Sequence, residues 1–79
     1  MGWRNNPAQA AVGKAIRHCA YTMTALAELL AYIEDSHPEI TDCALKCGAT
    51  VQAVLDVLLE LHDDAWGPLP HDLAEIVYR

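Results

Sequence analysis

Phenylalanine is absent from this 79-residue chain, and positively charged residues are few. Lysine and arginine together number 5, against 11 aspartates and glutamates, so the formal net charge is −6. A surface that binds nucleic acid needs clustered lysine and arginine, and this deficit argues against direct nucleic acid binding. It also argues against binding to an anionic membrane surface.

Long apolar runs are missing as well. Charged residues interrupt every candidate for the ~20 apolar residues that span a bilayer; the interruptions are Arg17, Glu28, Glu34, Asp56 and Glu60. The N-terminus lacks the basic and apolar segments of a secretory signal. The three cysteines are an odd number, which does not suit a complete disulfide framework. We therefore expect a soluble, cytoplasmic protein with reduced cysteines and no membrane association.

Two stretches share a seven-residue hydrophobic repeat whose steps alternate between four and three residues. This spacing keeps an apolar seam along one side of an α-helix, whereas a strand needs a step of two. The first seam comprises Val12, Ile16, Cys19, Met23, Leu26, Leu30 and Ile33. The second comprises Ile40, Ala44, Cys47, Val51, Val54, Leu58, Leu61 and Ala65. The sequence therefore predicts an all-α fold in a single domain over residues 1–79.

The expected elements are an N-terminal arm over 1–6, one long helix over 7–35, a second over 37–65 and a short C-terminal helix over 71–78. Asn6 suits an N-cap, and Pro7 suits the first helical position. Ser36, followed three residues later by Glu39, predicts a capping box for the second helix.

Two glycines in the second half of the chain have different expected roles. Gly67 suits the position after a helix end, and the prolines that follow it cannot continue a helix. Gly48 lies within the second long helix, but the hydrophobic repeat keeps its phase across it. We therefore expect one continuous helix there.

Two helices of similar length joined by a short turn are expected to fold back as an antiparallel hairpin. The numbers of facing residues would then sum to about 73 or 74. This register predicts three pairs of opposite charge between the helices: Glu28 with Lys46, Arg17 with Asp56, and Lys14 with Glu60. Exposed ion pairs contribute only ~0.2–1 kcal/mol each, so these would fix the register more than the stability.

A hairpin of this kind leaves apolar surface uncovered. The uncovered positions beside the seams are Ala25 and Leu29 in the first helix and Leu55 and Leu59 in the second. A line of small residues, which would let another helix approach closely, comprises Ala8, Ala11, Ala15, Thr22 and Ala25. The C-terminal helix, together with Trp3 and Trp66, would close the open end like a lid. This C-terminal segment is too small to cover the remaining apolar surface. Stable helical domains bury such surface against further helices. We therefore expect a homodimer that forms a four-helix bundle, or a different partner that supplies the missing helices.

The sequence carries no catalytic signature. Cys43 and Cys47 share a helix face and resemble half of a zinc site, but no second close pair completes four ligands. His62 precedes Asp63, yet adjacent helical residues do not face each other and cannot form a triad-like contact. A Gly-rich phosphate loop and the HExxH pattern are absent. We therefore predict a non-enzymatic protein with no catalytic residues, no cofactor and no metal site.

Acidic residues gather at both ends of the expected hairpin. They are candidates for docking a partner with a basic surface, although acidic runs also serve simply as solvated surface. Exposed tyrosines are enriched at interfaces and add candidate anchors. The candidate partner-binding residues are Tyr21, Tyr32, Glu34, Asp35, Glu39, Asp42, Asp63 and Asp64.

These features favour a small acidic protein-protein interaction module that inhibits or regulates a larger macromolecular complex. One concrete version is a phage-type inhibitor of host nucleic-acid-binding machinery, such as an anti-CRISPR. A first alternative is a thiol- or metal-dependent sensor that uses Cys43, Cys47 and a histidine across a dimer interface. A second alternative is a structural subunit of a larger complex or of a toxin–antitoxin pair.

Overall fold

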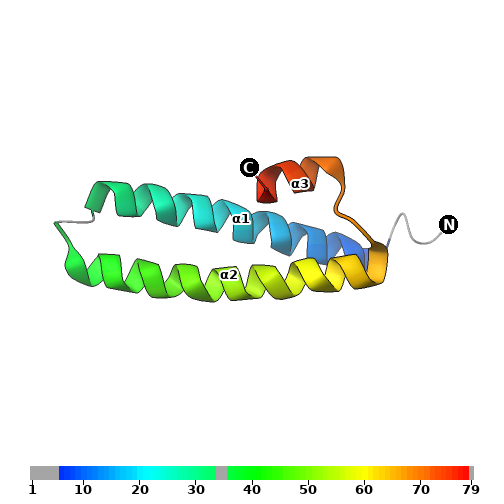
Figure 1. Ribbon diagram of the computed structural model, residues 1–79, viewed down its shortest axis with the longest axis horizontal. Coiled ribbons are helices and arrows are strands. Elements are labelled where there is room, and N and C mark those ends of the chain that lie inside the picture. Colours follow the sequence, from blue (N-terminus) through cyan, green and yellow to red (C-terminus); the bar gives the residue numbers. More distant parts are fainter. Residues whose placement is uncertain (1–5, 34–35, 79) are drawn as a thin grey trace.

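Two long helices and one short helix make up the computed structural model, which describes residues 6–33 and 36–78. Helix α1 spans Pro7–Ile33, α2 spans Pro38–Trp66 and α3 spans His71–Val77. Helices α1 and α2 lie side by side and antiparallel, and α3 returns along the N-terminal half of α1 (Figure 1). The described ranges contain no strand, and the predicted all-helical class is confirmed. A helix with the length and apolar character of a membrane span is not found among the described residues. The dimeric four-helix bundle stays a prediction.

Helix α1 begins where the sequence places its N-cap. The Asn6 Oδ1 accepts hydrogen bonds from the backbone N–H groups of Ala8 at 2.9 Å and Gln9 at 3.3 Å. These bonds satisfy two of the N–H groups that have no partner within the helix. The first helix was expected to extend to residue 35, but residues 34–35 lie outside the described ranges, as does Trp3 of the expected lid.

The predicted capping box at the start of α2 is absent. The N-cap is His37, and no side chain of residues 6–33 or 36–78 caps this helix. Ser36 lies one position too early, and its hydroxyl donates instead to the backbone carbonyl of Ile33 at 3.3 Å. Pro38 occupies the first position of α2, where a proline removes one of the N–H groups that would need a cap. Gly67 ends this helix with a φ of 85°, and its N–H donates to the carbonyl of Asp63.

The core is small and lies at the open end of the hairpin. Its centre is one large side chain from each helix: Ile16, Leu55 and Leu73. Leu59 and Leu69 are half-buried against this cluster. The expectation that Leu55 and Leu59 are uncovered is therefore wrong, because the segment that leads into α3 turns back over them.

Helix α2 faces α1 with a different side from the predicted second seam. The buried positions in its C-terminal half are Leu55 and His62, whereas Val54 and Leu61 are 47% and 46% exposed. Val54 and Leu61 are thus wrong as core positions of the single chain, and their place in a dimer seam stays a prediction. Three further members of the second seam are exposed: Ile40, Cys47 and Ala65. Its other members, Ala44, Val51 and Leu58, are buried or half-buried, as are all seven members of the first seam.

The predicted ion pairs between the two long helices are wrong. Arg17 lies 3.6 Å from Asp72 of α3, because α3 packs on this part of α1. Lys46 pairs with Asp42, one turn earlier in α2, at 3.0 Å. Within 6–33 and 36–78, no ion pair joins α1 to α2. The expected register nevertheless agrees with the packing, since a Cβ placed on Gly48 would lie 3.8 Å from the Leu26 side chain.

Candidate functional site

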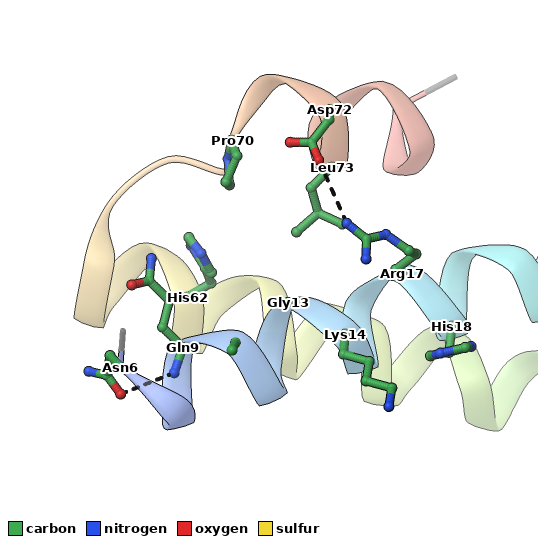
Figure 2. A pocket seen from close by; sticks show the side chains of 11 residues that line it. Asn6, Gln9, Gly13, Lys14, Arg17, His18, His62, Pro70, Asp72 and Leu73 are labelled. Atoms are coloured by element: carbon green, nitrogen blue, oxygen red, sulfur yellow. Dashed lines mark hydrogen bonds and ion pairs between the residues drawn. The ribbon is translucent and has the colours of Figure 1, made fainter. Parts of the chain in front are cut away.

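An open cleft lies where α3 crosses the N-terminal half of α1 (Figure 2). Its volume of about 690 Å³ is within the ~300–1,000 Å³ typical of small-molecule sites. Leu73 and Gly13 form its apolar part, and Gln9 and His62 lie towards the end where α1 begins.

His62 is the buried polar residue of this region, with 2% of its surface exposed. Its Nδ1 lies 2.9 Å from the carbonyl oxygen of Gly67, so Nδ1 carries the proton and donates it. The ring also packs edge-on against Trp66, with the centroids 5.4 Å apart. These contacts connect the last turns of α2 to the segment that leads into α3. His62 therefore holds this closing segment, residues 67–70, in place, and no acidic side chain of the described residues is its partner.

The charged side chains around the cleft do not converge on a common point. Arg17 turns towards Asp72 of α3, and Lys14 and His18 point away from Leu73 (Figure 2). A site for an anion or for proton transfer needs several such groups aimed at one position. In the part of the chain that the structure describes, no three His, Cys, Asp or Glu side chains gather as a metal site.

The cysteines are separated in the structure. Cys43 and Cys47 are exposed on α2, while Cys19 is half-buried against the core. The first two share a side of α2, and the described residues gather no third metal ligand beside them. A site assembled across a dimer interface stays a prediction.

The candidate partner-binding residues lie on exposed surface but in separate places. Tyr21 and Tyr32 on α1 are 49% and 88% exposed. The remaining described candidates are all exposed and lie at the two ends of α2: Glu39 and Asp42 at its start, Asp63 and Asp64 near its end. At 1.5 Å per residue these two groups are about 32 Å apart. Glu34 and Asp35 lie outside the described residues.

A further surface lies on the side of the hairpin away from α3. Helix α3 meets α1 at Gly13 and Arg17, and the segment leading into it packs with Leu59 of α2. At 100° per residue in a helix, the opposite sides of α1 and α2 form one continuous surface of the antiparallel pair. We call this surface the apolar face. It consists of an α1 row, Ala8, Ala11, Ala15, His18, Thr22, Ala25 and Leu29, and an α2 row, Cys43, Cys47, Thr50, Val54, Val57 and Leu61.

The apolar face is exposed along its length. Of its members only Ala15 is half-buried, and Val57 has 63% of its surface accessible. Neither row contains Asp, Glu, Lys or Arg. The α1 row contains the predicted line of small residues, and His18 and Leu29 are additional members. The α2 row is not predicted as a separate surface, because Cys47, Val54 and Leu61 belong to the predicted second seam. The steps of four and three residues from Cys43 to Leu61, with no charge among them, are the signal that identifies this row.

Comparison with known proteins adds no relative: no family model matches this chain, and neither does any curated protein or solved structure.

Proposed function

We propose that this protein is a non-enzymatic interaction module, which inhibits or regulates a larger macromolecular complex by binding to it. The observation that carries this proposal is the apolar face, an exposed surface that follows both long helices and contains no Asp, Glu, Lys or Arg. Large exposed apolar patches on small proteins mark interaction sites. Most charged side chains lie elsewhere on the molecule, and Glu39 and Asp64 lie just beyond the two ends of the α2 row, so surfaces of different chemistry are available for binding.

The two sides have different partners in this proposal. The apolar face pairs with a second copy of the chain in a four-helix bundle. The exposed residues Tyr21, Tyr32, Asp63 and Asp64, which lie in separate places on the molecule, engage a protein with a basic surface. Complementary charge of this kind accelerates association and selects partners. An anti-CRISPR type of inhibitor fits this description, since its target is a protein whose basic surface holds nucleic acid.

The acidic contact is tested with a double variant, Asp63→Lys/Asp64→Lys. A matched control, Asp56→Lys/Glu60→Lys, makes the same change in net charge at exposed positions of the same helix. Each protein is immobilised and exposed to the soluble proteins of its native host, and the retained proteins are identified by mass spectrometry. We expect the wild-type chain and the control to retain a common protein that the Asp63/Asp64 variant loses, with helicity unchanged by circular dichroism. Equal retention by all three would refute the acidic contact.

A further inference from the structure

The structure carries a more specific inference about self-association, which rests on the proposed function. We propose that the apolar face is the interface between two copies of this chain, with α2 of each copy lying along α1 of the other. The two α3 helices would then lie on the outer sides of the four-helix bundle.

Charge favours a second copy over a charged partner at this surface. Each chain carries a formal net charge of −6, so two copies repel each other when their acidic sides approach. The apolar face contains no Asp, Glu, Lys or Arg, and contact through it keeps the acidic residues of the copies apart. A basic partner would gain no charge complementarity from this face, whereas a second copy needs none.

The sizes of the side chains also complement each other. In the antiparallel hairpin, Ala11 and Ala15 of the α1 row lie at the same end of the molecule as Val57 and Leu61 of the α2 row. A second copy, related to the first by a 180° rotation about an axis parallel to the helices, places its large α2 side chains on these alanines. Small residues allow helices to approach closely, and large residues fill the space between them.

The other end of the apolar face shows the reverse arrangement. There Leu29 is the large member of the α1 row, and the α2 row offers the smaller Cys43 and Cys47. The same rotation therefore places a large side chain against small ones at both ends. A two-fold axis makes every such match twice, because each contact and its symmetry mate are equivalent.

The available area is sufficient for a specific dimer. The rows are about 30 Å long at 1.5 Å per residue. Two helices packed side by side, each ~10–12 Å across with its side chains, present a face roughly 19 Å wide. Two such faces would bury roughly 1,100 Å² in total, which exceeds the ~1,000 Å² expected of a specific interface.

Sedimentation equilibrium at micromolar concentration tests the assignment with two matched variants. Val54→Glu alters the apolar face, and Leu45→Glu makes the same kind of change on the opposite side of α2, where Leu45 is 57% exposed. We expect the wild-type chain and Leu45→Glu to be dimers. We expect Val54→Glu to be helical but monomeric, with the dissociation constant raised at least ~100-fold. Both copies carry the substitution, and each copy weakens the affinity by ~10-fold.

Cysteine cross-linking tests the orientation of the helices. Cys43 and Cys47 are first replaced by alanine. Two variants of this chain, one with Ala11→Cys and the other with Leu61→Cys and a different tag, are mixed, and the mixture is mildly oxidised. We expect the mixed disulfide dimer to form preferentially. Self-cross-linking of the Leu61→Cys copy would place α2 along α2 and contradict the orientation.

Three outcomes would overturn the inference as a whole: a monomeric wild-type chain, a Val54→Glu chain that still dimerises, or a dimer that only Leu45→Glu disrupts. None of them decides the proposed contact with a larger protein. That contact depends on Asp63 and Asp64 and is measured separately by retention of host proteins. Conversely, loss of that contact would leave the dimer assignment intact.

Discussion

Replacing His62 with alanine tests whether the buried histidine holds the closing segment in place. The side chain is 2% exposed, donates to the Gly67 carbonyl at 2.9 Å and packs edge-on against Trp66. The substitution removes the ring and the hydrogen bond together. We therefore expect α3 to lose part of its attachment to the hairpin, and the whole chain to lose stability.

The expected loss follows from these contacts. A hydrogen bond contributes ~1 kcal/mol, an aromatic pair contributes ~0.5–1.5 kcal/mol, and the cavity left by a buried ring costs more. The total for His62→Ala is about 3 kcal/mol, a large share of the ~4–12 kcal/mol expected for a domain of this length. His62→Asn keeps an N–H donor near the position of Nδ1 but lacks the ring. We expect it to recover about 1 kcal/mol of the loss.

Urea unfolding followed by circular dichroism measures both variants, at one protein concentration because self-association would shift the midpoint. A loss of ~3 kcal/mol corresponds to a fall in melting temperature of more than about 10 °C. A His62→Ala chain within ~1 kcal/mol of the wild type would refute the structural role of this residue. A similar loss in His62→Asn would mean that the ring, and not the hydrogen bond, carries the effect.

The same unfolding assay checks four smaller effects. Gly67→Ala is expected to cost ~1–2 kcal/mol, because its φ of 85° strains any residue with a Cβ. Gly48→Ala is expected to stabilise by up to ~1 kcal/mol, since the added Cβ meets its nearest side chain at an ordinary 3.8 Å. Asn6→Ala is expected to cost ~1 kcal/mol through the lost N-cap. A double-mutant cycle on Arg17 and Asp72 is expected to give less than ~1 kcal/mol, because the pair is solvent-exposed.

The sequence predicts the helical class and the register but not the buried side of α2. This helix carries apolar residues on adjacent positions, such as Val54 beside Leu55, and periodicity alone allows either one to face inward. The choice depends on α3, which brings Leu73 against Leu55. The buried His62 was missed because a polar residue does not count in a hydrophobic repeat, and its partner is a backbone carbonyl that only the turn after α2 provides.

The predicted ion pairs between the helices do not form, although the register predicted together with them is correct. The three predicted pairs agreed with an antiparallel hairpin, yet Arg17 turns to Asp72 and Lys46 turns to Asp42. Exposed charges gain little from any one partner, so a long side chain pairs with whichever carboxylate lies nearest. Apolar packing fixes the register instead, as the approach of Leu26 to Gly48 indicates.

The position of α3 connects the fold to the proposed dimer. Helix α3 covers one side of the open end, so the three-helix core formed there leaves the opposite side free over the full length of the hairpin. Near the turn between α1 and α2 only two helices are present, and Leu26 and Leu30 are no more than half-buried. In the proposed dimer, the second copy supplies the missing burial at that end. In that dimer the apolar face would stabilise the fold as well as the assembly, and would add to the small core formed by Ile16, Leu55 and Leu73.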